Sequence, residues 1–271
     1  DHPSLVDPES GIIVSANNDP RDLDSSCGEI WGYFSDRQRY ERIKKLIKSK
    51  GTKIDIDDMK DIQLDDKTNM HNLILADVFA VISKGINKDK FSQTMLSDVV
   101  SWDGTHGLED HRPTVFYQFL SKLIKEIFYV EGLDDKSYKK FVASHEIYKI
   151  VKNIIKDKYS VWWTDSSGKI NRDNFIISVW KKTVDQFRYK FNENLKKMAW
   201  KNFHKVEVSH ILGKQYPLNY LFNIGPYSIR GGNEVVNNQE YYLAGDKFSV
   251  IAGPSIRRII DMGSPERFLG I

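Results

Sequence analysis

The sequence predicts an α+β fold in which a long helical segment lies between two β-rich ends. Hydrophobic residues recur with a helical period through most of residues 31–205, and short β-runs precede and follow that segment. We therefore predict one domain over residues 1–271: a strand and an Asn-Asn loop in 1–20, helices in 31–205, and strands with Gly-rich loops in 206–271. The two β-rich ends are expected to pair into one sheet, with the helices inserted between them.

The composition is that of a globular protein with a substantial core. Of the 271 residues, 40% are hydrophobic and 12% are aromatic. The 40 Lys and Arg residues are interspersed with 37 Asp and Glu residues, so no basic block is present to bind nucleic acid or an acidic membrane. No stretch reaches the roughly 20 apolar residues of a transmembrane helix. We expect neither nucleic acid nor a membrane as a partner.

The cellular compartment stays undecided at this level. Cys27 is the sole cysteine, so neither an intrachain disulfide nor a cysteine-based zinc site is expected. The amino end, DHPSLVDPESG, is polar where a signal peptide has an apolar region. If the protein is exported, we expect its signal to lie outside this chain.

The first predicted elements are a short strand and a helix. The strand, Ile12 to Val14, is stopped by the turn-forming residues Asn17, Asn18 and Pro20. An apolar stripe then predicts a helix over DRQRYERIKKLIKSK, with Gly51 as its C-cap. The stripe comprises Tyr40, Ile43, Leu46 and Ile47.

The middle of the chain predicts a layer of helices. Asp55 is a candidate N-cap for IDDMKDIQLDD, and apolar stripes continue through residues 73–82 and 95–100. Pro113 opens a strongly apolar helix that we expect to close at Gly132. Two further helical patterns cover residues 144–158 and 172–203.

The tail predicts strands joined by loops. NYLFNI, KFSVIAG and RRIIDM are strand candidates, and GPYSIRGGNEVVNN is expected to form a loop.

Two amides at the end of the first predicted strand are candidates for catalysis. The side chains of Asn17 and Asn18 can donate hydrogen bonds in a set direction, as an oxyanion hole for acyl transfer requires. The alternative is an ordinary turn, because Asn tolerates left-handed backbone geometry. Arg37 could be a buried guanidinium that orients this loop, or a surface arginine at the start of a helix.

Other chemical sites receive less support. A loop, WDGTHGLEDHRP, brings together His106, Glu109, Asp110 and His111, which could bind a metal. Cys27 could be a nucleophile, but nothing beside it would lower its pKa. The glycine loop at 231–233 has no phosphate-binding pattern, and the histidines at 71, 145, 204 and 210 are scattered and receive no role.

Seven segments together resemble the β chain of penicillin acylases, members of the N-terminal-nucleophile hydrolases. They occur in the same order over nearly the whole chain. The segments are VDPESGIIVSANNDP, WGYFSDRQRYERIKKLI, IDDMKDIQLD, VVSWDGTHGLED, WKNFHKVEVSHILG, FNIGPYSIRGGNEVVNN and GPSIRRIIDMGSPERFLGI.

The resemblance implies an αββα sandwich with a large inserted helical layer, and an amide hydrolase made as a self-cleaving precursor. In this family the first residue of the β chain, a serine, is the nucleophile, and its free α-amino group is the base. By its motif, Asn17 matches the asparagine that donates to the oxyanion, and Arg37 matches the arginine that supports this loop. Asn18 is expected to hold the turn.

The departures from the family pattern concern the two ends of the chain. The family's serine lies well upstream of the Asn-Asn segment, so we expect the nucleophile to be absent from this chain and Asp1 to have no catalytic role. The chain also stops at FLGI, before the family's Gly-Gln-Ser-Gly segment. The α chain and an upstream β-chain segment of the same precursor are the expected partners, with a small-molecule amide as the substrate.

No metal or other cofactor is predicted from this chain. Some family members bind calcium, and Asp24 or Glu29 falls near the relevant region, but the spacing to Arg37 does not match. Many relatives are periplasmic or otherwise exported.

Two alternatives to a catalytic fragment stay open. One is a non-catalytic interaction domain that keeps the acylase scaffold, and the other is a metal-dependent hydrolase built on His106 to His111.

Overall fold

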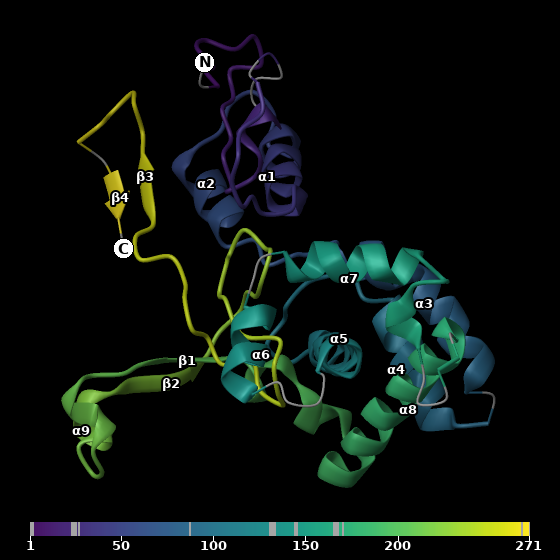
Figure 1. Ribbon diagram of the computed structural model, residues 1–271. Coiled ribbons are helices and arrows are strands. Elements are labelled where there is room, and N and C mark those ends of the chain that lie inside the picture. Colours follow the sequence, from purple (N-terminus) through teal and green to yellow (C-terminus); the bar gives the residue numbers. More distant parts are fainter. Residues whose placement is uncertain are drawn as a thin grey trace.

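A computed structural model shows a helical body with two short β-hairpins that extend from it (Figure 1). It describes residues 3–22, 26, 28–86, 88–129, 134–143, 146–164, 168–169, 171–266 and 268–270. Helices dominate and strands are few, so the predicted α+β class is confirmed.

A small amino-terminal unit consists of the Asn-Asn segment and two helices, α1 (Gln38–Ser49) and α2 (Ile56–Gln63). The predicted stripe of α1 packs against Val14 and Ala16, both of which are buried. Gly51 has φ +84° just beyond α1, in the left-handed region that favours glycine at a helix end. Asp55 caps α2 in a capping box, since its side chain accepts from the backbone N–H of Asp58 over 2.8 Å. Both helices are therefore confirmed as predicted.

The strand predicted at Ile12 to Val14 is wrong. In the described part of the chain these residues belong to no β-ladder, and the strands begin only at Lys205. The apolar side chains of this segment are buried against α1 instead, so the segment needs no sheet to shield them from water. The expectation that the two ends share one sheet is wrong as well.

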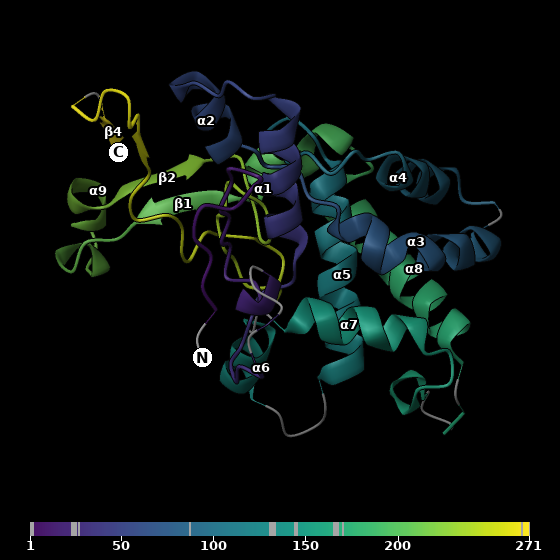
Figure 2. The same cartoon turned by 90° about the horizontal axis from the view of Figure 1, so that it is seen from above.

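The helical body is built around α5 (Arg112–Phe128), which Figure 1 shows end-on and Figure 2 shows along its length. α5 packs on α4 and α8, and α3 contacts α4, α7 and α8. The surrounding helices are α3 (Met70–Gly85), α4 (Lys90–Val100), α6 (Asp135–Val142), α7 (Ile147–Lys156) and α8 (Arg172–Phe191).

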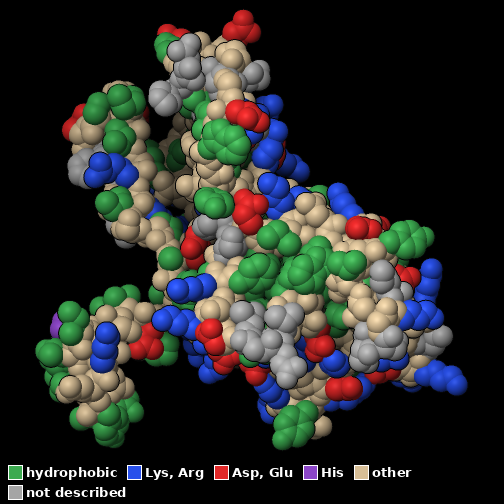
Figure 3. Space-filling model, in the orientation of Figure 1, with side chains coloured by type: hydrophobic (Ala, Val, Ile, Leu, Met, Phe, Trp, Pro, Cys, Tyr) green, Lys and Arg blue, Asp and Glu red, His purple; other side chains and the backbone are tan. Residues whose placement is uncertain are grey.

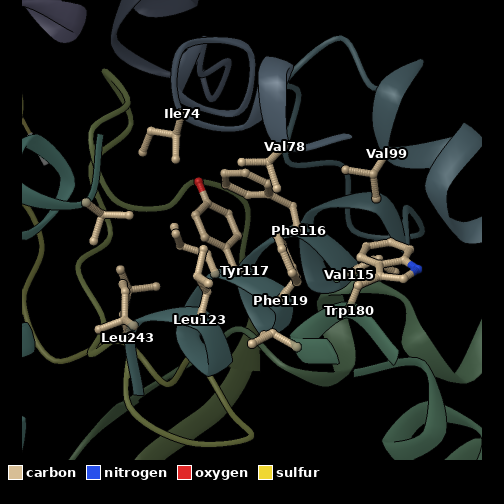
Figure 4. Close-up of a cluster of buried hydrophobic side chains, with 14 of the residues drawn as sticks. Ile74, Val78, Val99, Val115, Phe116, Tyr117, Phe119, Leu123, Trp180 and Leu243 are labelled. Atoms are coloured by element: carbon tan, nitrogen blue, oxygen red, sulfur yellow. The ribbon is translucent and has the colours of Figure 1, made fainter. Parts of the chain in front are cut away.

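Most of α5 is buried and only a narrow charged stripe reaches the surface, which explains its strongly apolar sequence. Figure 4 shows Phe116 and Phe119 of α5 among side chains from α3, α4 and α8. The indole N–H of Trp180 in α8 donates to the hydroxyl of Ser92 in α4 over 2.8 Å, so a polar group within this core is satisfied. Pro113 lies in the first turn of α5 as predicted, whereas Gly132 lies outside the described residues.

Two features of the helical body differ from the prediction. No helix was predicted at α6, a short amphipathic helix. The pattern over 172–203 does not form one helix, because Asn192 and Glu193 both have positive φ and end α8. Two 3₁₀ turns, η3 (Leu195–Met198) and η4 (Trp200–Asn202), follow, and two more lie at η1 (Pro20–Asp22) and η2 (Val161–Trp163).

The carboxyl-terminal part forms two antiparallel hairpins. β1 (Lys205–Val208) pairs with β2 (Ile224–Ser228), and β3 (Arg258–Ile260) pairs with β4 (Phe268–Gly270). The strand predicted in RRIIDM is thus confirmed as β3. The turn between β1 and β2 contains η5 (Leu212–Lys214) and α9 (Asn219–Phe222).

The other two strand predictions in the tail are wrong. NYLFNI begins as the helical turn α9, two residues after Pro217, and enters a strand only at Ile224. KFSVIAG is extended but forms no ladder: the backbone N–H groups of Phe248, Val250 and Ile251 donate to Phe203, Lys205 and Glu240, and Ala252 forms a single bridge with Glu240. The buried Phe248 packs into the core. In the residues that the structure describes, no helix is both long and apolar enough to cross a membrane.

Candidate active-site segment

The Asn-Asn loop places its two amides in different environments. Asn17 has φ +58° and its side chain faces solvent, whereas Asn18 is buried with 6% of its surface exposed. The side-chain oxygen of Asn18 accepts from the backbone N–H of Ala16 over 3.0 Å, and its amide nitrogen donates to the carbonyl of Asp19 over 3.2 Å. The backbone of Asn17 is held from the other side, because its carbonyl accepts from the N–H of Ser35 over 2.8 Å. Asn18 therefore closes the turn, and Asn17 projects from it.

Arg39 sets the orientation of the Asn17 side chain. Its Nη2 atom donates to Oδ1 of Asn17 over 2.5 Å and to the carbonyl of Ala16 over 2.7 Å. Because a guanidinium can only donate, the atom that faces it must be the amide oxygen, and the amide nitrogen must point away. Within the described residues, Nδ2 of Asn17 has no hydrogen-bond partner. The loop therefore presents one exposed N–H donor group in a fixed direction.

Arg37 lies on a different side of α1. Its Nη2 atom pairs with Oε1 of Glu41 over 2.9 Å, its guanidinium carbon is 5.8 Å from the ring centroid of Tyr40, and 57% of its side chain is exposed. Residues two positions apart point about 200° apart around a helix, so Arg37 and Arg39 face nearly opposite directions. The structure therefore brings Arg39, and not Arg37, to Asn17. The sequence analysis did not single out Arg39, although it lies in the same DRQRY segment as Arg37.

A polar cleft of about 580 Å³ lies beside this loop. Asp19, Ser35 and Asp36 line it on the side of the loop, and Lys149 and Lys152 line it on the side of α7. Nζ of Lys152 lies 2.9 Å from Oδ2 of Asp36. Partial burial raises the pKa of Asp36, but the hydrogen bond and charge of the Lys152 ammonium lower it. The net effect is a lowered pKa. The carboxylate is thus charged at neutral pH, and the cleft can accept a polar molecule.

The proposed metal site around residues 106–111 does not form. Nδ1 of the buried His106 lies 2.6 Å from the carbonyl of Asp66, and Nε2 lies 3.0 Å from the hydroxyl of Tyr117. Since a carbonyl only accepts, Nδ1 carries the proton and Nε2 accepts from Tyr117. Both ring nitrogens are therefore used within the core.

The neighbours of His106 are also engaged elsewhere. Nε2 of His111 lies 2.7 Å from Asp98, while the carboxylates of Glu109 and Asp110 pair with Lys201 and Arg112. Across the described ranges, no group of three or more His, Cys, Asp or Glu side chains is arranged to hold a metal ion. The metal-dependent hydrolase alternative is wrong, because each candidate ligand points to its own partner.

The glycine loop at 231–233 has a structural role. A Cβ at Gly231, where φ is +100°, would lie 2.4 Å from the carbonyl of Asn237, and a Cβ at Gly232 would lie 3.0 Å from His106. The side chain of Asn233 bonds to Tyr148 and to the backbone of Tyr241. The loop is glycine-rich because it passes close to the core.

The remaining candidates have no described site. Cys27, Asp24 and His145 lie outside the residues that the structure describes, and Glu29 is exposed. His71 and His204 are buried in the aromatic core, and His210 lies on the exposed β1–β2 hairpin.

Comparison with known proteins completes these observations. A search of curated proteins finds no match. The family model described as penicillin amidase matches residues 1–271, which is the whole chain, and therefore includes the Asn-Asn loop, the helical body and both hairpins. The chain belongs to the penicillin amidase family.

Proposed function

We propose that this chain supplies the oxyanion-binding segment of an amide hydrolase that cleaves an acyl-amide bond through an acyl-enzyme. Membership of the penicillin amidase family supports a hydrolase. The observation that carries the proposal is the exposed Nδ2 of Asn17, which has no partner among the described residues while Arg39 holds the other end of the amide.

The arrangement suits acyl transfer for an electrostatic reason. When a nucleophile attacks an amide carbonyl, negative charge develops on the carbonyl oxygen, and a donor that is already oriented stabilises this charge without reorganisation. Asn17 provides such a donor. Contact with the positive guanidinium of Arg39 keeps the amide from rotating and places a positive charge behind it. Its hydrogen bond to the substrate strengthens as the charge grows, which favours the transition state over the ground state.

The nucleophile in this proposal is a serine at the amino end of a self-cleaved precursor segment, with its own α-amino group as base. An α-amino group has a pKa near neutrality and can accept the hydroxyl proton at physiological pH. The ordered family motifs of this chain support this part of the proposal, together with an αββα sandwich for the assembled enzyme. The resemblance assigns the supporting arginine to Arg37, and that role stays a prediction beside the observed contact of Arg39.

An exposed apolar arm supports a partner from the same precursor. The arm, residues 205–228, comprises β1, η5, α9 and β2, which pack mainly on one another, and it extends from the helical body (Figures 1 and 3). Ile211, Tyr220 and Leu221 near its end are 80%, 78% and 75% exposed. Exposed apolar surface of this extent marks an interaction site. We propose that the arm packs against the α chain or an upstream β-chain segment.

The test is the covalent state of the full-length gene product. Intact-mass measurement and amino-terminal sequencing should find two chains, with a serine at the new amino terminus, and alanine in place of that serine should leave the precursor uncut. Purified mature protein should hydrolyse a small acyl-amide. An uncut product without amidase activity would support the second candidate function, a non-catalytic interaction domain, which the exposed arm also favours.

A further inference from the structure

A second cavity, of about 450 Å³, lies in the helical body and is formed by elements other than those that form the Asn-Asn loop. Its walls come from α5, α6, α8 and the segment 244–246. Two of its wall residues, Gln118 and Ser121, are buried side chains that donate to the backbone carbonyls of Asp246 and of the neighbouring Leu243, over 2.8 and 3.0 Å. These bonds tie the segment to α5, so the cavity has a rigid wall.

Three lysines line this cavity without a carboxylate partner among the described residues: Lys122, Lys125 and Lys139. Most cations nearby are paired, as Lys182 is with Glu126. Within the described residues, these three lysines bring positive charge to the cavity that no ion pair neutralises directly.

Lys122 is the most informative of the three because it is partly buried. Among the described residues, its Nζ donates to two neutral oxygens, the side-chain oxygen of Gln186 over 2.6 Å and the carbonyl of Lys182 over 3.2 Å. Burial lowers the pKa of Lys122, and the charges of Asp246 and Glu126 offset only part of this effect, so the net pKa is lowered. Nζ of Lys125 lies 5.0 Å from the ring centroid of Tyr129, which directs it along the surface of the same helix. An anion in the cavity would offset the desolvation of Lys122.

The described acidic residues at the cavity offset this charge only in part. Asp246 is already engaged by Lys190 and by the side-chain amide of Gln186 over 2.7 Å. Asp135 accepts a hydrogen bond from the hydroxyl of Tyr129 over 3.3 Å and is exposed. If the charge of Lys190 is set against that of Asp246, the three lysines Lys122, Lys125 and Lys139 remain, and Asp135 is the one further carboxylate among the lining residues.

Tyr138 adds an independent observation. It lines the cavity, only 4% of its surface is exposed, and its buried hydroxyl has no hydrogen-bond partner in the part of the chain that the structure describes. Burial raises the pKa of Tyr138, so the hydroxyl stays protonated and can donate. A buried hydroxyl without a partner destabilises the protein, and an acceptor oxygen of a ligand would satisfy it once the side chain shifts to expose the hydroxyl.

We propose that this cavity binds a small phosphorylated metabolite, with its phosphate oxygens against Lys122, Lys139 and Tyr138. Lysine is a common phosphate ligand, acting as a point charge. The volume exceeds the space that inorganic phosphate fills and lies in the range of small-molecule sites, so the ligand carries further atoms beyond the phosphate. The site is independent of the proposed amidase function.

The test uses pyrophosphate as the probe in calorimetric titrations of the purified protein at low and moderate salt. Wild-type protein is expected to bind with a Kd below about 1 mM, more weakly as salt increases. Lys122→Gln and Lys139→Gln should each weaken binding about tenfold, since each removes one charged hydrogen bond. Tyr138→Phe should weaken it by a smaller factor while leaving the charge unchanged.

The matched control is Lys140→Gln. Lys140 is an exposed lysine next to Lys139 in α6, but it does not line the cavity. Its substitution should leave the Kd within about twofold of wild type, because it removes the same charge outside the site. If Lys139→Gln and Lys140→Gln weaken binding equally, the attraction is nonspecific and the proposal is overturned. The absence of saturable binding would overturn it as well. Tighter binding of citrate than of pyrophosphate would overturn the assignment to a phosphate. Because Lys139 is exposed, its variant should fold even if Lys122→Gln does not.

Discussion

Arg39 donates a hydrogen bond through Nη2 to the side-chain oxygen of Asn17 over 2.5 Å, and the same nitrogen bonds to the carbonyl of Ala16. This contact joins the first turn of α1 to a loop 22 residues earlier in the chain. A guanidinium has no acceptor, so the contact determines which end of the amide faces solvent. The pair therefore turns an exposed asparagine into a directional donor.

Replacing Asn17 with alanine should lower kcat/KM of the full-length enzyme by about 10²–10³, because one oxyanion donor is lost. The matched control is Asn192→Ala. Asn192 is also exposed and has φ +48°, so both variants place alanine in left-handed backbone, at a similar cost in stability. Steady-state kinetics together with thermal melting separate the two effects. If both variants lose the same activity, Asn17 has no catalytic role.

Arg39→Ala should reduce kcat by about 10–100-fold with a smaller change in KM, since the amide of Asn17 is no longer held. Arg37→Ala is the comparison. The pair between Arg37 and Glu41 is an exposed i,i+4 ion pair, worth about 0.3–0.5 kcal/mol, so its loss should hardly affect folding. A larger loss of kcat in the Arg37 variant would restore the role that the family resemblance assigns to Arg37.

Gly104→Ala should destabilise the protein far more than Gly51→Ala. Both glycines have positive φ, +92° and +84°, so alanine is strained at either position by about 1–2 kcal/mol. At Gly104 a Cβ would also lie 1.9 Å from the carbonyl oxygen of Thr68, whereas at Gly51 no atom of the described residues would lie within 4 Å of it. We expect an additional loss of at least about 2 kcal/mol, measured by urea unfolding. Equal losses would show that the backbone at Thr68 moves freely.

Stability should fall as the pH drops from about 6.5 to about 4. Burial lowers the pKa of His106 and of His204 from 6.5 to about 4. Above about pH 6.5 the histidines are neutral in both states. Between the two pKa values the unfolded chain binds protons that the folded chain does not, so the free energy of unfolding decreases by about 1.4 kcal/mol per pH unit for each histidine. Below about pH 4 both states are protonated and this loss ends.

Urea unfolding across this pH window measures the slope. His204→Gln should reduce the slope by about 1.4 kcal/mol per pH unit, and an unchanged slope would contradict the assignment.

Asp103 titrates in a separate window. Burial opposes the shift, but hydrogen bonds from Lys67 and Thr105 lower the pKa of Asp103 to about 2, from 3.8. Its stabilisation is lost only as the pH falls below about 3.8.

If the arm packs against another chain of a self-cleaved precursor, as proposed, Leu221→Glu should weaken that association without unfolding this chain. Leu221 is 75% exposed, so the substitution costs little unless a partner buries it. Tyr189→Glu is the control, because Tyr189 is 91% exposed on α8, outside the arm. Copurification of the chains after self-cleavage measures the effect. If neither variant lowers the yield of complex, the arm is not the interface.

Local patterns were sufficient for the helices that carry strong signals of their own. Asp55 predicted the start of α2 because a carboxylate can cap the first turn, and the structure shows this bond. The apolar stripe of α1, the left-handed Gly51 and the apolar sequence from Pro113 were equally informative. In each case the interaction lies within about one helical turn, so sequence neighbours contain the information.

Strands and the candidate site depended on distant partners. The Ile12 segment is apolar, but its sequence does not determine whether it pairs in a sheet or packs on a helix. In the structure it packs on α1. The orientation of Asn17 depends on Arg39. Arg37 and Arg39 lie in one segment and point to different sides of the helix, so the local sequence did not show which of them reaches the loop.

The sequence by itself determined the α+β class, the main helices and, through the order of its motifs, the family. The tertiary structure decided which arginine reaches Asn17, that His106 belongs to the core rather than to a metal site, and that Lys122, Lys139 and Tyr138 share one cavity. The physical reason is that helices are stabilised by contacts close in sequence, whereas sites combine side chains from distant segments whose approach depends on the packing of the whole core.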